Sequence, residues 1–482
     1  MAVREDRSSG SDTFVSSASN EVEARGKKKH AWTRRARRAA VRFGAQVDRG
    51  WSRLRAPQRL AVGYAIYAAV GTLSLCLPWT QRSWNSPLDH LFNVVSALST
   101  TGLTTISVAD SYTLAGQLVI LALFQLGGVG FMTISSVIII ARSRPLSEAR
   151  MGVLRTGFAL PHYFKIRHFL VQLIVFTLAC EALGALILWW RFSIAGVEAP
   201  LWSAVFHSVS AFATAGFSLN NTSLEAFADD WIVNLTVGGL CYAGAIGFIV
   251  AQDVYYSVKL RERMLTLTSR TILTMTAAVF LIGVPLLAAL DPTLRALPLG
   301  SRILAAAFQV MSASSTAGFN TVPISALGAS SLVVIMILML IGASPSGTGG
   351  GIKTTSVSAI LGHLLSILRG RDSVVWLGNV IPPARVAYAS AAASLYVVTL
   401  VLGVFCLTIT ERKDFLPLMF EAASAIGTVG LSMGVTGELT PIGKVIVICL
   451  MFVGRVGPLT LGLALLAPAP KRSVGPGDDL AV

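Results

Sequence analysis

The sequence predicts an all-α integral membrane protein made of four tandem repeats, each a helix, a re-entrant half-helix with its loop, and a second helix. Of the 482 residues, 54% are hydrophobic and 13% are charged, and the mean hydropathy is +0.68. A soluble domain would carry roughly a quarter of charged residues on average, whereas a surface in contact with lipid does not need them. Together with eight apolar runs and a motif that recurs four times, this composition predicts eight transmembrane helices and four re-entrant half-helices in a pseudo-fourfold arrangement around one pore.

The eight apolar runs give the expected positions of the long helices. They cover residues 61–79, 114–141, 169–190, 231–251, 271–290, 331–343, 388–410 and 443–467. A bilayer core is crossed by about 20 apolar residues in a helix, and most of the runs reach that length. The run 331–343 is too short, which predicts that the second helix of the third repeat is interrupted.

Basic residues alternate between loops in a way that predicts the orientation of the chain. The net charge is +15, and Lys and Arg gather in residues 25–59, 142–167 and 259–270 and at Arg369, Arg371 and Arg385. The loops between these clusters are poor in basic residues or mix them with acids. This positive-inside pattern predicts a multi-pass protein of the cell (inner or plasma) membrane with both termini in the cytoplasm. The basic segment 1–58 is predicted to be a disordered cytoplasmic tail that lies against anionic lipid rather than one that binds nucleic acid.

One twelve-residue motif recurs four times and defines the repeats. The copies read FNVVSALSTTGL, FHSVSAFATAGF, FQVMSASSTAGF and FEAASAIGTVGL, starting at Phe92, Phe206, Phe308 and Phe420. All share Phe-x-x-x-Ser-Ala-x-x-Thr-x-Gly followed by Leu or Phe. Apolar runs flank each copy, so we predict repeats at residues 59–142, 143–258, 259–368 and 369–470, followed by a C-terminal tail at 471–482.

The Thr-x-Gly part of the motif predicts a filter for a monovalent cation. The stretch before it, such as residues 92–99, forms a half-length helix of about 12 Å, and the chain after it must expose backbone carbonyls inside the protein or beside water. Four such segments around an axis form a ring of oxygens that replaces the water shell of an ion such as K+, and glycine allows the backbone angles that this needs. The alternative, small residues that pack helices together, suits one Thr-x-Gly better than four at matched positions. The predicted ion-binding residues are Thr100, Thr101, Gly102, Thr214, Ala215, Gly216, Thr316, Ala317, Gly318, Thr428, Val429 and Gly430.

A glycine-rich stretch interrupts the third repeat and predicts a gate. Residues 342–356 read GASPSGTGGGIKTTS, which cannot continue as a regular helix. A plain linker would fall beyond the membrane boundary of the other repeats, so we expect a loop buried below the filter. The predicted gate residues are Gly342, Ala343, Ser344, Pro345, Ser346, Gly347, Thr348, Gly349, Gly350, Gly351 and Lys353, with Arg455 from the fourth repeat.

Several charged and polar positions leave two interpretations open. Arg455 is expected either to place a positive charge in the pore or to form an ion pair, for which Glu181 is the main acidic candidate, because an intramembrane arginine rarely faces lipid. Lys353 either acts beside it or marks the cytoplasmic end of its helix. The residues after the motif phenylalanines are all polar: Asn93, His207, Gln309 and Glu421. Glu421 and Asp89 either attract cations to the mouth or satisfy helix N-termini.

From residue 59 to about residue 467 the chain resembles the Trk/Ktr/HKT superfamily of potassium and sodium transporters, and within it the KtrB-type membrane subunits of bacterial Ktr systems. The resemblance is carried by the four filter segments, GASPSGTGGGIKTTS and MFVGRVGPLT. It implies a homodimer, each protomer with its own pore, and a cytosolic regulatory ring of KtrA-like (RCK-type) subunits that bind ATP or ADP. It also implies Na+ as an activator and no cofactor on this chain. The family's filter glycines correspond to Gly102, Gly216, Gly318 and Gly430, and the presence of the first favours potassium over sodium.

These observations predict potassium uptake through a gated, channel-like pore, with mainly sodium or mixed transport as the alternative. A membrane-embedded enzyme is disfavoured because the six histidines are scattered and no HExxH or GxSxG pattern occurs.

Overall fold

The computed structural model describes residue 54 and residues 56–130, 166–260, 265–345 and 347–466. The predicted tails and Ser346 lie wholly or almost wholly outside these residues. The helices described belong to the unit Leu60–Val482, together with the first residues of the helix that opens it.

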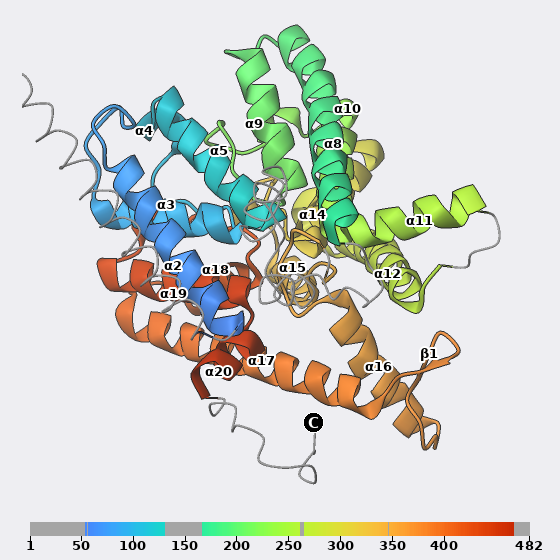
Figure 1. Ribbon diagram of the computed structural model, residues 1–482. Coiled ribbons are helices and arrows are strands. Elements are labelled where there is room, and N and C mark those ends of the chain that lie inside the picture. Colours follow the sequence, from blue (N-terminus) through green and yellow to red (C-terminus); the bar gives the residue numbers. More distant parts are fainter. Residues whose placement is uncertain (1–53, 55, 131–165, 261–264, 346, 467–482) are drawn as a thin grey trace, which may run out of the picture. The chain divides into compact units, whose positions relative to one another are not determined.

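The described elements follow one order four times along the chain (Figure 1). A long helix comes first, then a shorter helix, an irregular stretch and a second helix. The first round comprises α2 (Ala56–Leu75), α3 (Pro87–Ser99), α4 (Val108–Ser111) and α5 (Leu114–Val129). The second comprises α8 (Ile166–Ile194), α9 (Pro200–Phe212), η1 (Glu225–Phe227), α10 (Trp231–Ile246) and α11 (Phe248–Leu260).

The third round is α12 (Leu267–Leu290), α13 (Pro292–Arg295), α14 (Leu299–Ser315), η2 (Ile324–Ala326), α15 (Ala329–Ile341) and α16 (Thr354–Leu368). A short antiparallel hairpin follows, in which β1 (Val375–Trp376) pairs with β2 (Asn379–Val380). The fourth is α17 (Pro383–Thr410), α18 (Phe415–Gly427), η3 (Thr436–Glu438), α19 (Pro441–Val456) and α20 (Pro458–Leu466).

The shorter helices α3, α14 and α18 end directly before the motif threonine and α9 ends two residues before it, and all four begin earlier than the sequence suggested. Helix α3 starts at Pro87, where the Ser86 side chain caps it, rather than at residue 92. It has 13 residues, as do α9 and α18, and α14 has 17. The motif phenylalanines therefore lie within these helices, and all four are buried in the core.

Each second helix ends at a glycine with positive φ. Helices α5, α10 and α19 each have 16 residues and stop at Gly130, Gly247 and Gly457, with φ values of 86° to 88°. Helix α15 has only 13 residues and stops at Gly342, with φ 69°. The predicted early stop in the third round is confirmed. Glycine ends these helices because it adopts positive φ without the penalty that a Cβ brings.

The prediction of eight transmembrane helices, with the second helix of the third repeat interrupted, is borne out in part among the described residues. Among the described residues, three helices are long and apolar enough to cross a membrane: Leu170–Ile194, Leu267–Leu290 and Pro383–Thr410. A fourth span is possible if α10 and α11, which meet at a bend of 92°, count as one.

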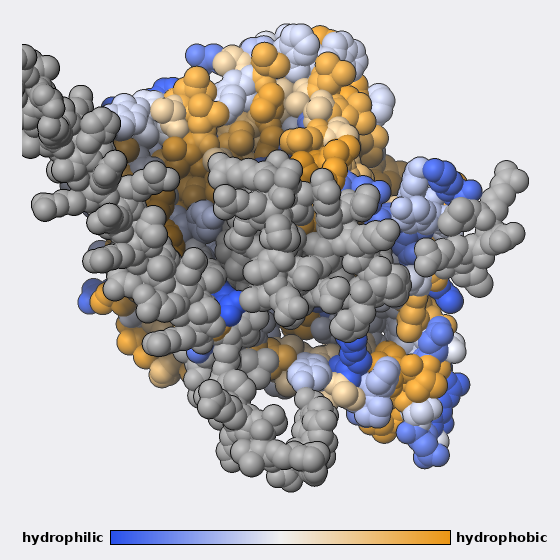
Figure 2. All heavy atoms as spheres, in the orientation of Figure 1, coloured by the Kyte–Doolittle hydropathy of each residue, from blue (hydrophilic) through white to orange (hydrophobic). Residues whose placement is uncertain are grey.

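The long helices turn apolar side chains outward. On α8, Val175 and Leu183 are each 61% exposed, and on α12 Leu281 is 70% exposed. Figure 2 shows hydrophobic side chains over the helices at the top of the view. Exposed apolar faces of this extent are typical of helices in contact with lipid rather than water.

Candidate functional site

The four Thr-x-Gly segments meet in a closed cycle. A methyl group built on Gly102 would lie 2.6 Å from the Ala215 carbonyl oxygen and 3.0 Å from the Gly216 Cα. Gly216 stands in the same relation to Gly318, Gly318 to Gly430, and Gly430 back to Gly102, with Cα atoms 3.0–3.2 Å from the built methyl groups. Segments more than a hundred residues apart thus surround one axis, and a side chain at any of the four glycines would strike the backbone of the next segment.

The same local backbone repeats in all four segments. The threonines have φ values of 49° to 57°, a left-handed conformation that ends each helix. The following residue then donates its N–H to the carbonyl of the motif serine, at 2.8–2.9 Å. Within the described residues, no hydrogen bond reaches the carbonyl oxygens of the residues between threonine and glycine, namely Thr101, Ala215, Ala317 and Val429. The repeated turn therefore leaves four carbonyl oxygens free at the cycle of glycines.

Two motif serines take part in a way that the sequence analysis did not foresee. The Gly102 N–H donates to Ser96 Oγ at 3.1 Å, and the Gly430 N–H donates to Ser424 Oγ at 3.0 Å. The serine that recurs in every copy of the motif could have indicated this role.

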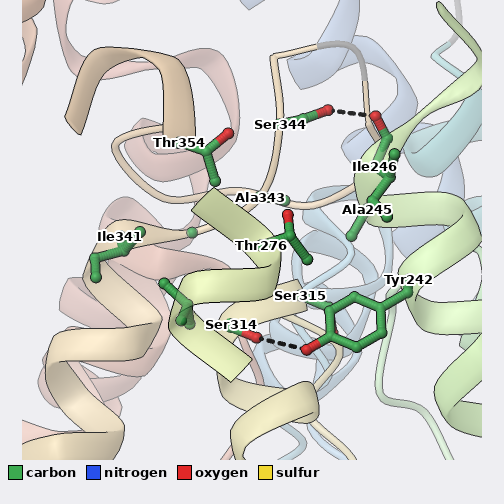
Figure 3. Close-up of a pocket in the computed structure, with 12 residues that line it drawn as sticks. Tyr242, Ala245, Ile246, Thr276, Ser314, Ser315, Ile341, Ala343, Ser344 and Thr354 are labelled. Carbon is green, nitrogen blue, oxygen red and sulfur yellow. Dashed lines mark hydrogen bonds between the residues drawn. The ribbon is translucent and has the colours of Figure 1, made fainter. Parts of the chain in front are cut away.

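The segment of residues 342–353 lies against the second round of elements. The Ser344 N–H donates to the Ala245 carbonyl at 3.2 Å, and its Oγ donates to the Ile246 carbonyl at 2.7 Å (Figure 3). The Thr348 N–H donates to the Gly244 carbonyl at 3.0 Å. These carbonyls are freed by the end of α10 at Gly247, so the break in one helix supplies acceptors to the segment that breaks another.

This segment also reaches all four motif threonines. Thr348 Oγ1 lies 3.0 Å from Thr214 Oγ1, and the Thr100 hydroxyl lies 3.4 Å from the Thr348 carbonyl. The Gly350 N–H donates to Thr316 Oγ1 at 2.9 Å. A methyl group built on Gly350 would lie 2.1 Å from the hydroxyl of the fourth threonine, Thr428. The segment therefore covers the threonine side of the cycle.

Arg455 joins this segment to the first round. Its Nη1 donates to the Thr348 carbonyl at 2.5 Å and to Thr100 Oγ1 at 2.9 Å, and its Nη2 donates to the Gly127 carbonyl. The ion pair with Glu181 is not formed: that carboxylate accepts from Gln125 Nε2 at 2.8 Å.

Lys353 forms hydrogen bonds within the segment. Its Nζ donates to the Gly349 carbonyl at 2.6 Å and lies 3.3 Å from the Gly350 carbonyl. Lys353 directly precedes the first residue of α16. It acts on the same segment as Arg455.

The polar residues after the motif phenylalanines do not lie at helix N-termini, whereas Asp89 lies in the first turn of α3. Asn93, His207, Gln309 and Glu421 lie within their helices, and none has exposed surface. They contact the chain just after the glycines instead, as His207 Nε2 does with Ser218 Oγ at 2.9 Å. Asp89 forms an ion pair with Lys444 at 2.6 Å.

Two cavities adjoin the segment. One of about 460 Å³ is lined by residues of the segment, by Arg455 and by Tyr64, Tyr67 and Tyr396. The other, of about 10 Å³, lies between Tyr242, Ser314 and Thr354 (Figure 3), and it has room for about one water molecule.

Known proteins are similar to this chain in fold and in sequence. The solved structure of the potassium transporter TrkH from Vibrio parahaemolyticus has a TM-score of 0.68 and 22% identity, covering 84% of each chain. Ktr system potassium uptake protein B of Bacillus subtilis (strain 168) is 36% identical over 419 residues, 85% of this chain and 93% of the relative. The protein of the same name from Vibrio alginolyticus is 34% identical over 411 residues, covering 84% and 90%. The potassium/sodium uptake protein NtpJ of Enterococcus hirae is 32% identical over 433 residues, covering 87% and 94%.

The outward apolar helices, together with the matching family model and curated relatives, which are cation transporters by description or name, indicate a membrane transporter rather than an enzyme. The family model TrkH, described as a cation transport protein, matches residues 65–473. The chain belongs to this family.

Proposed function

We propose that this protein takes up potassium across the cell membrane and that the four Thr-x-Gly segments, one from each repeat, are its selectivity filter. The closed cycle of Gly102, Gly216, Gly318 and Gly430 carries the proposal. It groups four free backbone carbonyls around one axis, and such oxygens can replace the water shell of K+. The helices before them end at the cycle, so their partly negative ends also favour a cation. The names of the relatives from Bacillus and Vibrio support potassium as the ion.

The segment 342–353 acts as the gate in this proposal. It covers the threonine side of the cycle, and its bonds to Thr214 and Thr316 occupy hydroxyl groups that a passing ion would meet there. Arg455 adds a positive charge 2.9 Å from Thr100 Oγ1, which opposes a cation at that position. An ion can pass only when the segment moves, and the cavity of about 460 Å³ beside it offers room for that movement.

The proposal also includes the orientation of the chain, its oligomeric state and its regulatory partner. Both termini face the cytoplasm, the protein is a homodimer with one pore in each protomer, and a cytosolic KtrA-like ring that binds ATP or ADP controls the gate. Na+ acts as an activator. The term "Ktr system" in the relatives' names supports a second subunit.

The alternative is a transporter that carries mainly sodium or both ions, which the name of the Enterococcus relative supports. Growth of a strain deficient in potassium uptake, on low potassium and with or without sodium, separates the two. We expect rescue at low potassium. Failure to rescue, together with strong sodium flux in vesicles, would overturn the potassium proposal.

A further inference from the structure

One buried carboxyl group lies behind the fourth Thr-x-Gly segment. Glu421 is in the middle of α18 and has no exposed surface. Its Oε2 contacts Ser432 Oγ at 2.9 Å, and its Oε1 contacts Thr436 Oγ1. Ser432 follows Gly430 by two residues. Glu421 therefore holds the chain at the point where it leaves the cycle of glycines.

The three side chains form a closed triangle of oxygen contacts. Ser432 Oγ and Thr436 Oγ1 lie 3.0 Å apart, which closes the ring that starts and ends at Glu421. All three contacts lie within hydrogen-bonding distance, and a hydrogen bond needs one hydrogen atom between its two oxygens. The two hydroxyl groups supply one hydrogen each, and an ionised carboxylate supplies none. A protonated carboxyl group supplies a third hydrogen, which lets all three contacts be hydrogen bonds at once.

A backbone N–H group also contacts this triangle, but it does not change the number of hydrogens available to the three oxygen contacts. The Gly434 N–H donates to Ser432 Oγ at 3.0 Å. That bond uses a lone pair of the hydroxyl oxygen and leaves its hydrogen for Glu421. With the carboxyl group protonated, every donor and acceptor in the triangle has a partner.

Glu421 also lacks a cation to balance a charge. Of the potential cations near it, Lys444 pairs with Asp89, Lys413 pairs with Glu438, and Arg455 binds the gate segment. Within the part of the chain that the structure describes, none pairs with Glu421. An ionised carboxylate that is buried without a partner is strongly unfavourable.

The titratable groups on the elements around α18 are Arg385, Tyr388, Tyr396 and Cys406 on α17, Lys444, Cys449 and Arg455 on α19, and Glu411, Arg412, Lys413, Asp414 and Glu438 in the adjoining segments.

The equivalent residues of the other rounds are uncharged and make the same kind of bridge. Asn93 Nδ2 donates to the Ile106 carbonyl at 3.2 Å. Gln309 Nε2 donates to Thr321 Oγ1 at 3.4 Å. His207 Nδ1 donates to the Ser203 carbonyl at 2.7 Å, so Nε2 is left to accept from a serine hydroxyl. All four positions call for a neutral group that can join a pore helix to the chain beyond the glycine.

We propose that Glu421 is a neutral carboxylic acid that positions the outer end of the fourth filter segment through its ring with Ser432 and Thr436. The inference rests on the proposed function of the segment as a filter. When the carboxyl group loses its proton, the ring loses one of its three hydrogens and a negative charge appears behind the filter. Selectivity should therefore decline as pH rises.

Two variants separate a neutral acid from a charged one. Glu421→Gln keeps a donor and an acceptor without the proton, and Glu421→Ala leaves both hydroxyl groups without their partner. We expect the glutamine variant to keep the K+/Na+ permeability ratio in proteoliposomes within about twofold, and alanine to lower it by about fivefold or more. The wild-type ratio should fall at alkaline pH, while that of the glutamine variant stays constant.

Infrared spectroscopy of the purified full-length protein tests the protonation itself. The wild type should show the C=O stretch of a protonated carboxyl group, which Glu421→Gln removes and the control Glu181→Gln leaves in place. If no band is lost in Glu421→Gln, or if this variant loses selectivity as fully as alanine, the proposal is overturned. Unchanged selectivity in Glu421→Ala overturns the positioning role.

The filter has a separate test, so the two failures can be told apart. A Gly318→Ser variant that folds and keeps its selectivity would contradict the filter assignment. The infrared band of Glu421 does not depend on that outcome.

Discussion

Replacing Arg455 by glutamine tests whether the gate segment is held closed. The guanidinium binds the segment through one hydrogen bond, from Nη1 to the Thr348 carbonyl at 2.5 Å. Its other bonds go to Thr100 and Gly127, which lie outside the segment. A hydrogen bond with a charged donor contributes about 1.5–3 kcal/mol. Loss of the Thr348 bond alone should therefore shift the balance between open and closed pores by roughly ten- to a hundredfold toward open.

The assay is Rb+ uptake into proteoliposomes that contain the purified protein without a regulatory subunit. We expect faster basal uptake for Arg455→Gln than for the wild type. Lys444→Gln is the matched control, because it removes a charge from the same helix but only breaks the pair with Asp89. A folded Arg455→Gln protein with unchanged or slower uptake would refute the idea that this arginine holds the segment closed.

Three further substitutions test the remaining geometry. Gly318→Ser should lower K+/Na+ selectivity by about tenfold or more in bilayer recordings, since a Cβ there would lie 2.1 Å from a carbonyl oxygen of the next segment. Thr348→Val keeps the side-chain volume but removes a hydroxyl that bonds outside the gate segment, so basal Rb+ uptake should rise by about fivefold; unchanged uptake would count against the contact. Gly244→Ala places a methyl group 1.9 Å from the Phe212 carbonyl oxygen and should lower the thermal unfolding temperature, whereas Gly239→Ala, with nothing within 4 Å, should not.

The cycle of glycines was predictable because its information is local and repeated. In all four rounds the threonine at or just beyond the end of the shorter helix has a φ of 49° to 57°, and the glycine two residues later has a positive φ of 68° to 99°. An identical local turn, repeated with matched spacing, leads to a symmetric arrangement. The early stop of α15 at Gly342 was predictable for a similar reason, because the apolar run that forms this helix is short.

The breaks at Gly130, Gly247 and Gly457 were not foreseen, although each glycine ends a short sequence of the form Gly-x-(Val/Ile)-Gly, namely GGVG, GAIG and GRVG. Apolar runs continue through these glycines, and hydrophobicity alone cannot show that the backbone turns there. A methyl group built on the first glycine of each pattern, Gly127, Gly244 or Gly454, would lie 1.9–2.2 Å from a carbonyl oxygen near the end of α3, α9 or α18. The need for glycine there comes from tertiary packing, which hydrophobicity does not report.

The partners of charged side chains could not be read from the sequence either. Glu181 was the acidic candidate for one of the two interpretations of Arg455, the ion pair, but the contacts of Arg455 are backbone carbonyls and a hydroxyl from three distant segments. Such partners carry no sequence signal. The same holds for Asp89, whose partner Lys444 lies 355 positions away.

The central claim is that the four Thr-x-Gly segments bind the transported ion on their common axis. Anomalous diffraction from crystals soaked in Rb+ or Tl+ tests it directly. The account predicts density on the axis beside the carbonyls of Thr101, Ala215, Ala317 and Val429, and loss of that density in Gly318→Ser. Ordered ions elsewhere in the protein with none on this axis would contradict it.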